Sequence, residues 1–457
     1  MALISSSCRR VVVGLGKTGM SCVRYLARKG LPFSVVDSRQ HPPGLDELSS
    51  DYPRVPVFAG GFKQDILNGA DELIISPGVA LAQPEIAEAI AGGVKVAGDI
   101  ELFFRAVGDT PVVAITGSNG KSTVTTLLGL MAEEAGINVA VGGNIGIPAL
   151  ELLAQKADLY ILELSSFQLE TTDSMQAAAA TVLNMSPDHM DRYPSPVEYH
   201  AAKQRVYKGC KVAVHNLDDP LTAPLLPAST PAITFSGRMP DIGQYGLEVD
   251  KESGCCWLVK GTTRLLDTSE MLMVGQHNYM NALAALALGE AVGLELEPML
   301  NALRRFPGLP HRCQWVAQRN QVNWFNDSKA TNVGACTAAI NGLGTSIAGK
   351  IVLIAGGDGK GADFSELCQP VSRYVRRLVL IGRDASIIES QLSGSVAISR
   401  ARTLADAVAI GEHESQPGDA VLLAPACASF DMFKSFEHRG DEFCKLVVNR
   451  LKESAPC

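Results

Sequence analysis

The residues most able to do chemistry lie in a glycine-rich loop, Thr116–Thr123, with the sequence TGSNGKST. Lys121 can place a cation beside the β- and γ-phosphates of a nucleotide, while the loop glycines let backbone amides wrap around them. The hydroxyl of Ser122 or Thr123 can ligate Mg²⁺. Ile115 stands where the usual phosphate-binding loop has its first glycine, so an ordinary glycine-rich turn is the alternative interpretation.

A second loop, Gly14–Gly19, matches the pattern G-x-G-x-x-G, and Asp37 stands where an acid that binds a ribose belongs. The pattern is typical of a nicotinamide dinucleotide site. Physically it indicates only that amides at a helix N-terminus can approach a phosphate, with Lys17 available as a further cation. The nucleotide that carries the phosphate stays open.

Two phosphate-binding loops in separate parts of the chain favour a kinase-like or ligase reaction, in which one nucleotide is fuel and another is part of the substrate. A dehydrogenase that uses the first loop is one alternative, but it needs one dinucleotide and no additional ATP. A nucleotide-regulated binding protein that hydrolyses ATP without ligation is the other.

Strands and helices must hold these loops, and each of three segments alternates apolar strand-like runs, polar turns and helical patterns. This alternation predicts an α/β fold of parallel sheets flanked by helices, with ligands beyond the carboxyl ends of the strands. We expect a Rossmann-like domain at residues 1–99, a central P-loop ATPase-like domain at 100–308 and a Rossmann-like C-terminal domain at 309–457. The expected strands are Arg10–Val13, Phe33–Val36, Leu73–Ile75, Pro111–Ile115, Asp158–Leu162, Ala179–Leu183, Val322–Phe325, Ile351–Ala355, Leu378–Ile381 and Ala420–Leu423, and the clearest helices are Met20–Lys29, Leu127–Ala135, Pro196–Lys208 and Asn278–Val292.

Composition narrows the class of protein. The 457 residues are 46% hydrophobic, enough for two or three packed cores. The formal net charge of −8 argues against a general binder of nucleic acid or membrane surfaces. Eleven cysteines without a C-x-x-C pair favour reduced thiols over disulfides or a zinc site.

The N-terminus begins with a pattern close to a secretion signal. Arg9 and Arg10 could open a twin-arginine signal, but the apolar stretch that follows is short, is interrupted by glycine and lacks a small-residue cleavage site. No apolar run reaches the roughly 18–20 residues that span a bilayer. We therefore predict a cytoplasmic location without membrane contact.

Nine motifs in order carry a family resemblance. They are TGSNGKST, GGNIG (Gly142–Gly146), ELSSFQLE (Glu163–Glu170), SPDHMDRY (Ser186–Tyr193), HAAKQRVY (His200–Tyr207), GQHNYMNALAALAL (Gly275–Leu288), GLPHR (Gly308–Arg312), NDSKATN (Asn326–Asn332) and GGDGKGADF (Gly356–Phe364). Over essentially the whole chain they resemble the Mur ligases. Within that family, NDSKATN and the absence of DNPR favour the member that adds D-glutamate over those that add L-alanine, a diamino acid or the terminal dipeptide.

The resemblance implies a reaction and its partners. ATP phosphorylates the carboxylate of UDP-N-acetylmuramoyl-L-alanine, and D-glutamate attacks the acyl phosphate through a tetrahedral intermediate, in the synthesis of peptidoglycan precursors. It implies ATP and Mg²⁺, with two ions, and small-molecule substrates. Nothing in the sequence suggests an obligatory protein partner, so we expect a monomer. Folylpolyglutamate synthase shares the ligase layout, but it does not need the domain of about a hundred residues that precedes the P-loop here.

The resemblance also assigns residues to sites. Catalytic roles fall to Lys121, His189 and a carbamylated Lys203, and metal binding falls to Ser122, Glu163, His189 and Lys203. The ATP residues are Gly117, Ser118, Asn119, Gly120, Lys121, Ser122, Thr123, Asn278, Asn281, Arg312, Asp327 and Lys329. The UDP-sugar residues are Leu15, Thr18, Asp37, Ser38, Arg39, Ser76, Pro77, Gly78, Asn144 and Ser165, and the D-glutamate residues are Thr331, Lys360, Ser429 and Phe436.

Several of these side chains have ordinary alternatives. Lys203 and Lys360 could be solvated surface lysines, and Asn278 could merely cap a helix. His189 is an unusual ligand for a hard cation and could be structural. Cys427 has no apparent activating partner, so we interpret it as a small buried residue and not as a nucleophile.

Overall fold

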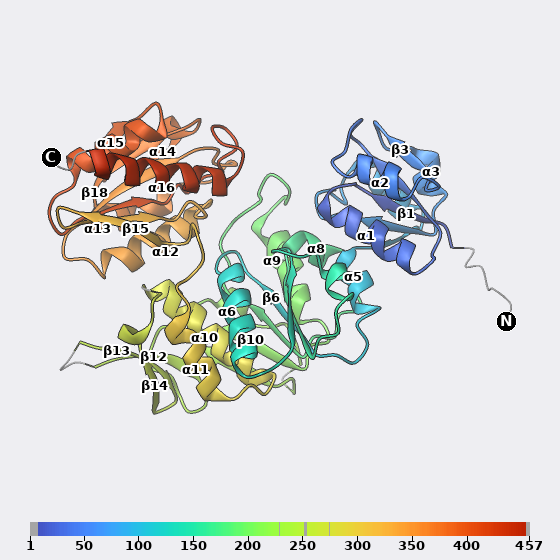
Figure 1. Cartoon of the computed structure of the whole chain (residues 1–457), viewed down its shortest axis with the longest axis horizontal. Coiled ribbons are helices and arrows are strands. Elements are labelled where there is room, and N and C mark those ends of the chain that lie inside the picture. The colour runs from blue at the N-terminus through green and yellow to red at the C-terminus, as the bar shows by residue number, and fades with distance from the viewer. Residues whose placement is uncertain (1–7, 228, 251–253, 274, 454–457) are drawn as a thin grey trace.

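The computed structural model describes residues 8–227, 229–250, 254–273 and 275–453, which form three α/β domains in chain order (Figure 1). The N-terminal domain is a five-stranded parallel sheet of order β3-β2-β1-β4-β5. Its elements are β1 (Arg10–Val13), α1 (Lys17–Arg28), β2 (Phe33–Asp37), α2 (Leu45–Asp51), β3 (Val57–Ala59), α3 (Gln64–Asn68), β4 (Glu72–Ile75), α4 (Pro84–Ala91) and β5 (Lys95–Ala97).

The central domain is built on a nine-stranded sheet of order β14-β13-β12-β11-β10-β9-β6-β8-β7. Strands β6 to β11 pair in parallel, whereas β12, β13 and β14 form an antiparallel edge. The elements are α5 (Asp99–Phe104), β6 (Val112–Thr116), α6 (Lys121–Glu134), β7 (Val139–Gly143), α7 (Ala149–Leu152), β8 (Leu159–Glu163), α8 (Ser166–Glu170), β9 (Ala179–Val182), α9 (Pro196–Gln204), η1 (Arg205–Tyr207), β10 (Val212–Asn216), η2 (Pro220–Thr222), β11 (Ala232–Phe235), β12 (Tyr245–Val249), β13 (Cys256–Lys260), β14 (Thr263–Asp267), η3 (Thr268–Glu270), α10 (Gln276–Ala291) and α11 (Leu296–Arg305).

The C-terminal domain holds a six-stranded sheet of order β15-β16-β20-β17-β18-β19, in which only the edge strand β15 is antiparallel among the described pairs. Its elements are β15 (Gln314–Arg319), β16 (Val322–Asn326), α12 (Val333–Gly344), β17 (Ile351–Gly356), η4 (Ser365–Leu367), α13 (Cys368–Tyr374), β18 (Val375–Ile381), α14 (Ala385–Gln391), β19 (Ala397–Arg400), α15 (Leu404–Glu414), β20 (Ala420–Leu423) and α16 (Phe436–Glu453).

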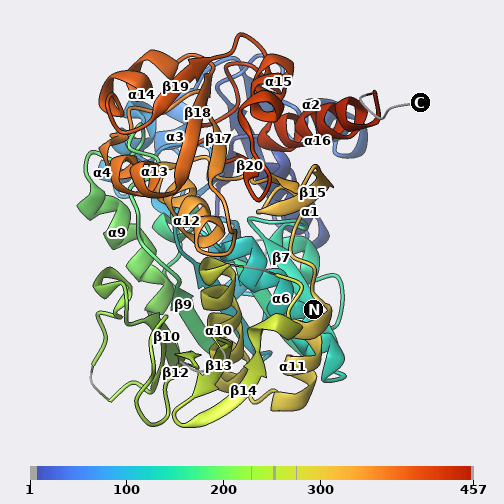
Figure 2. The ribbon, with the colours of Figure 1, turned by 90° about the vertical axis from the view of Figure 1, so that its left-hand side faces the viewer.

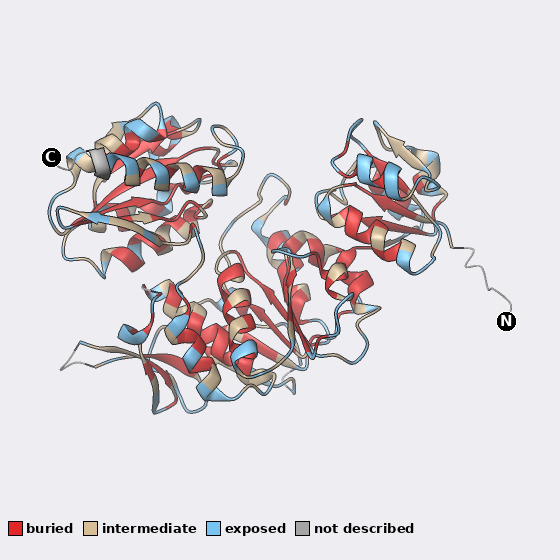
Figure 3. Cartoon of the chain, in the orientation of Figure 1, coloured by how far each residue is buried: buried red, intermediate tan, exposed pale blue. Residues whose placement is uncertain are grey.

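Burial explains why the central strands form. All residues of β6, β8, β17 and β20 are buried, as continuous apolar runs in two-sided parallel sheets should be (Figure 3). Helices cover both faces, and Figure 2 shows α12 of the C-terminal domain stacked over α10 of the central domain. Lys121 after β6 and Glu163 at the end of β8 line one cavity with Lys360, so the carboxyl ends of these strands face the C-terminal domain. The structure confirms the predicted α/β fold.

The structure corrects several predicted boundaries. Helix α1 begins at Lys17, three residues before the expected Met20, because Gly16 is already the extended cap residue. Gly19 in its first turn is required by a close approach, since a Cβ there would lie 1.9 Å from the Gly14 carbonyl oxygen. The helix expected over residues 196–208 ends at Gln204 and continues as the single turn η1. Among the described residues, no helix combines the length and apolar character needed to cross a membrane.

Candidate active site

The central loop folds as a phosphate-binding loop between β6 and α6. Gly120 has φ +82° and caps α6, and a Cβ there would lie 2.4 Å from the Asn281 side-chain oxygen, so glycine is required. Lys121 is the first residue of α6, and its Nζ donates to the carbonyls of Gly117 (2.8 Å) and Ser118 (2.9 Å). Its cation therefore lies over the loop, where anionic oxygens would meet it. Burial lowers the pKa of Lys121.

Glu163 at the end of β8 offers an incompletely satisfied carboxylate beside this loop. The residue is 3% exposed, and its Oε1 accepts a hydrogen bond from Asn144 Nδ2 at 2.7 Å. Its Oε2 is buried and has no hydrogen-bond partner among the described residues. A buried carboxylate oxygen without a partner is unfavourable unless a cation approaches it, so Glu163 fits a hard metal ion. The described residues contain no group of three His, Cys, Asp or Glu side chains that could hold a metal, so any ion must rely on other oxygens as well.

Lys203 on α9 is one of the most deeply buried side chains, with 2% exposed. Its Nζ donates to the Gly117 carbonyl at 2.8 Å and to Thr116 Oγ1 at 3.4 Å, and it lies 4.8 Å from the centre of the Tyr199 ring. Burial and the nearby Lys121 charge lower its pKa well below the ordinary value. The solvated-lysine interpretation is therefore wrong, and burial favours the neutral amine over the ammonium at this position.

Asp188 and His189 follow β9 in a loop that faces the C-terminal domain. Asp188 accepts a hydrogen bond from Lys360 Nζ at 2.8 Å and another from Asn332 Nδ2 at 3.2 Å. Burial acts to raise the pKa of Asp188, but the charges of Lys360 and His189 outweigh it and lower the value to about 2. The His189 ring packs edge-on against Phe167 with centroids 4.9 Å apart, and burial lowers its pKa. Lys360 is thus paired across the domain boundary and is not a surface lysine.

These groups line one cavity of about 290 Å³ between the central and C-terminal domains. It gathers most of the residues expected to be catalytic, to bind metal or to contact the reacting ends of the substrates. They are Ser118, Asn119, Gly120, Lys121, Ser122, Asn144, Glu163, Ser165, His189, Lys203, Arg312, Lys329, Thr331 and Lys360. The cavity is lined by five lysine or arginine side chains and by only two carboxylates, Glu163 and Asp188, so it suits a polyanion.

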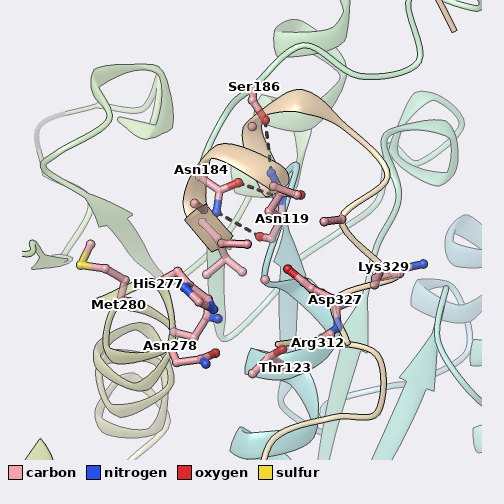
Figure 4. Close-up of a pocket in the computed structure, with 18 of the residues that line it drawn as sticks. Asn119, Thr123, Asn184, Ser186, His277, Asn278, Met280, Arg312, Asp327 and Lys329 are labelled. Atoms are coloured by element: carbon pink, nitrogen blue, oxygen red, sulfur yellow. Dashed lines mark hydrogen bonds between the residues drawn. The ribbon is translucent and has the colours of Figure 1, made fainter. Parts of the chain in front are cut away.

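A second cavity of about 300 Å³ continues from the first and is suited to a nucleoside (Figure 4). It contains Asn278, Asn281, Arg312, Asp327 and Lys329, all expected at the ATP site. Arg312 crosses the domain boundary and donates to Ser122 Oγ at 2.9 Å. Burial raises the pKa of Asp327 to about 7 and lowers that of Lys329 to about 8.

Sequence reasoning missed several residues of this second cavity. Asn184, two residues after the end of β9, binds the phosphate loop by exchanging hydrogen bonds with the Asn119 backbone at 2.8 and 3.0 Å (Figure 4). Phe235 and Asn216 come from strands the sequence did not predict. His277 stands inside the GQHN motif, which was the available signal, but no role was assigned to it.

The N-terminal loops line a separate cavity of about 400 Å³. It contains the expected Thr18, Asp37, Ser38, Arg39, Ser76, Pro77 and Gly78, together with Lys17. Leu15 lies in the core instead, but its backbone N–H donates to Asp37 Oδ2 at 2.7 Å. Burial acts against ionisation of Asp37, yet bonds from Arg39 and Leu15 leave its pKa lowered.

The four residues expected to bind D-glutamate are only partly gathered. Thr331 and Lys360 line the catalytic cavity, whereas Ser429 is 2% exposed and neither it nor Phe436 lines that cavity. Phe436 begins α16 and its ring lies 3.7 Å from Lys329 Nζ. Cys427 is buried, and burial raises the pKa of its thiol to about 12, as expected of an inert cysteine.

Three parallel-sheet domains, a phosphate loop and a cation-rich cavity between domains define an ATP-using enzyme assembled across a domain boundary. Family models match in the same order: "Mur ligase MurD-like, N-terminal domain" over residues 8–98, "Mur ligase middle domain" over 115–289 and "Mur ligase, glutamate ligase domain" over 311–427. The chain belongs to the Mur ligase family.

Relatives narrow the comparison further. The chain is 54% identical over 447 residues to the UDP-N-acetylmuramoylalanine–D-glutamate ligase of Pseudomonas aeruginosa, covering 98% of this chain and 99% of that protein. It is 55% identical to the enzyme of the same name from Pseudomonas putida, covering 97% of this chain and 98% of that protein. Among solved structures, the MurF ligase of Thermotoga maritima in complex with ADP matches with a TM-score of 0.63 at 16% identity, covering 99% of this chain and 98% of that one, which shows the shared fold.

Proposed function

We propose that this chain joins D-glutamate to UDP-N-acetylmuramoyl-L-alanine with the cleavage of ATP to ADP and phosphate. The observation that carries the proposal is the cavity of about 290 Å³ in which Lys121, Lys203, Arg312 and Lys360 converge from two domains beside a phosphate-binding loop. The similarity to ligases of that name, over almost the whole length of both chains, selects these substrates.

The first half-reaction transfers the γ-phosphoryl group of ATP to the substrate carboxylate, giving an acyl phosphate and ADP. Phosphoryl transfer depends mainly on positioning and on neutralising charge. Lys121 and the amides of the loop hold the phosphates, and Arg312 reaches them from the C-terminal domain. Asn278, Asn281, Asp327 and Lys329 bind the nucleoside part in the adjoining cavity.

The second half-reaction forms the amide. The amine of D-glutamate attacks the acyl carbon, the tetrahedral intermediate collapses, phosphate leaves and the amine releases its proton. Lys360 and Thr331 hold the amino acid by its carboxylates from the C-terminal side of the cavity, with Ser429 and the Phe436 amide beyond them. Asn144 and Ser165 hold the acceptor end of the UDP-sugar, whose diphosphate and uridine lie in the N-terminal cavity.

Mg²⁺ fits the acidic side of the same cavity. Glu163, Ser122, His189 and a carbamylated Lys203 would hold two ions, and the orphaned Glu163 Oε2 supports that placement. When bound, the ions supply charge neutralisation for the phosphates. We also propose that the protein acts as a monomer in the cytoplasm. There it would make precursors of peptidoglycan, the wall polymer on which cell shape and cell division depend. We propose that the domains divide at residues 99/100 and 308/309.

The test is phosphate release from ATP and Mg²⁺, with UDP-N-acetylmuramoyl-L-alanine and D-glutamate supplied singly and together. Release that needs both substrates, with L-glutamate inactive, is the expected result. Release that ignores the UDP-sugar would contradict the proposal and would return the N-terminal loop to a dinucleotide or regulatory role.

A further inference from the structure

Arg192 makes contacts that the proposed reaction does not use. It follows His189 by three residues, in the loop between β9 and α9. Its guanidinium donates to the Pro77 carbonyl and, at 3.2 Å, to the Val79 carbonyl of the N-terminal domain. Both carbonyls belong to the loop after β4, which lines the N-terminal cavity. One arginine from the central domain therefore holds the loop that would receive the UDP-sugar.

The other contacts of Arg192 lead to the catalytic cavity. Its guanidinium lies 3.9 Å from the centre of the Phe167 ring, and its Nη2 pairs with Glu170 at 3.0 Å. Phe167 also contacts His189, whose ring packs edge-on against it. Arg192 is only 14% exposed at its side chain, so these contacts are well shielded from water.

The segment between the two residues is stiff. The backbone N–H groups of Arg192 and Tyr193 both donate to the His189 carbonyl, at 2.9 and 3.0 Å, closing a turn. The Tyr193 hydroxyl donates to Glu170, which fixes the same carboxylate that Arg192 binds. These hydrogen bonds link the position of Arg192 to that of His189.

The other end of this turn reaches the third domain. Asp188 is held by Lys360 and Asn332 of the C-terminal domain. Residues 188–193 thus touch all three domains, and in Figure 1 the green loop that leads into α9 rises between the N-terminal and C-terminal domains. Within this turn, Arg192 is the contact on the N-terminal side.

We propose that Arg192 is a positioning residue that couples occupation of the UDP-sugar loop at residues 76–79 to the placement of His189 and Asp188 in the catalytic cavity. This inference rests on the proposed function, because it takes the N-terminal cavity as the UDP-sugar site. Binding of the diphosphate fixes the loop, the loop carbonyls fix Arg192, and the turn sets His189 where the substrate carboxylate arrives.

Hydrogen exchange of the full chain, with UDP as the probe, tests the coupling directly. In the native protein, UDP should slow exchange both in peptides covering residues 76–79 and in peptides covering 186–193. In Arg192→Gln, protection at 76–79 should remain and protection at 186–193 should be lost. Retained protection at 186–193 in this variant would overturn the proposal.

Arg28 provides a matched control. It also joins the N-terminal and central domains by one carboxylate, Glu151 at 3.1 Å, and one carbonyl, Leu150 at 3.3 Å, but it lies on α1 away from the cavities described above. Arg28→Gln should keep both protections. If it behaves like Arg192→Gln, the effect is general loosening of the domains and the coupling is wrong.

Kinetics supply a second readout. Arg192→Gln should lower kcat/KM for the UDP-sugar by roughly 10–100-fold, as expected for misplaced reacting groups, while KM for ATP stays within about threefold. Arg192→Lys, which keeps the charge but not the fork, should fall between. If UDP fails to protect residues 76–79 in the native protein, the proposed UDP-sugar site is itself wrong and the inference falls with it. If UDP protects residues 76–79 but not residues 186–193 in the native protein, the coupling through Arg192 is wrong while the proposed UDP-sugar site stands.

Discussion

Lys203 shows how burial changes the chemistry of a single residue. A buried ammonium beside a second lysine is disfavoured, which favours the neutral amine, the form that adds CO₂, releasing a proton and leaving a carbamate. The carbamate would carry a negative charge next to Lys121, which relieves the repulsion between the two lysines. Because Lys203 lies behind the phosphate loop, its carbamate would be placed to bind a metal ion there.

We predict that Lys203→Ala loses at least about 100-fold in kcat and that a small carboxylic acid such as acetate restores part of the activity. The physical reason is that the acid replaces the missing carboxylate in the space left by the side chain. Lys208→Ala is the control, because that lysine is 53% exposed and pairs with Asp173 on the surface. Absence of rescue, together with an unmodified mass at Lys203 in the native protein, would refute carbamylation.

Asp327 gives a prediction about pH and stability. Burial raises its pKa to about 7, against a backbone bond from Cys313 and the charge of Arg312. Between about pH 4 and pH 7 the folded protein therefore holds a proton that the unfolded chain has released. Because the folded state binds more protons in this window, its stability falls as pH rises through it.

Asp327→Asn removes that proton-linked loss. The Tm of the variant minus the Tm of the native protein should increase by roughly 3–8 °C as the pH rises from 5 to 8, measured by calorimetry without nucleotide. Parallel Tm profiles for the two proteins across this range would show that Asp327 is not neutralised by burial. The same variant should bind ATP more weakly above pH 7, where the native carboxylate is charged.

At the scale of elements, the predictable parts are the buried parallel strands and the loops that follow them. The predicted strands Arg10–Val13 and Ala420–Leu423 agree with β1 and β20 residue for residue, because a short continuous apolar run between turn residues predicts a buried strand. The strands β12 to β15 were not expected, since half-exposed edge strands such as the one at Thr263–Asp267 carry little apolar pattern. Strands β10 and β11 were not expected either, and their contributions to the nucleotide cavity, Asn216 and Phe235, were missed with them.

The residues of the candidate site also divide into those that the local sequence predicts and those that it does not. Lys121 is predictable from its place in the loop and helix that follow a buried strand, and Glu163 from its place at the end of one. Asp188 is not predictable, because its role depends on its contacts with Lys360 and Asn332, which lie more than 140 residues away in the chain. Pairings across domains leave no local pattern, and the motifs alone show only that both segments matter.

Helix α8 combines a structural and a chemical use of one serine. Ser165 Oγ accepts from the Gln168 backbone N–H at 3.2 Å, and the Gln168 side chain accepts from the Ser165 backbone at 3.1 Å, a capping box. Ser165 also lines the catalytic cavity. Loss of the cap should cost about 1 kcal/mol, and loss of the substrate contact should appear in kinetics.

We predict that three substitutions separate these roles. Ser165→Ala should lower both stability and kcat/KM for the UDP-sugar, whereas Ser165→Thr should keep both. Ser165→Asp should keep the cap but repel the substrate carboxylate beside Glu163, so stability is retained and activity falls. Urea unfolding and steady-state kinetics measure the two effects. If Ser165→Ala changes stability alone, Ser165 is a cap residue without a substrate contact.

At the scale of the whole molecule, the catalytic cavity exists only while the C-terminal domain sits against the central domain. Polar contacts cross this boundary beside the cavity: Arg312 donates to Ser122, Lys360 pairs with Asp188, and Asn332 donates to both Asn119 and Asp188. Lys360 has two uses here, because it pairs with Asp188 and is proposed to bind a carboxylate of D-glutamate. The substrate must therefore compete with Asp188 for the same ammonium.

We predict that Lys360→Met raises KM for D-glutamate by at least roughly 10-fold and leaves KM for ATP within about threefold, because the ammonium meets the amino acid and not the nucleotide. Asp188 then loses its charged cross-domain partner and keeps only the hydrogen bond from Asn332, so small-angle scattering of the free protein should show a larger radius of gyration. Lys360→Arg keeps the charge and should preserve the closed arrangement while binding D-glutamate less well. Lys350→Met, on the same domain but outside the cavity, is the control. An unchanged KM for D-glutamate in Lys360→Met would place the amino acid elsewhere and leave Lys360 as a closure contact only.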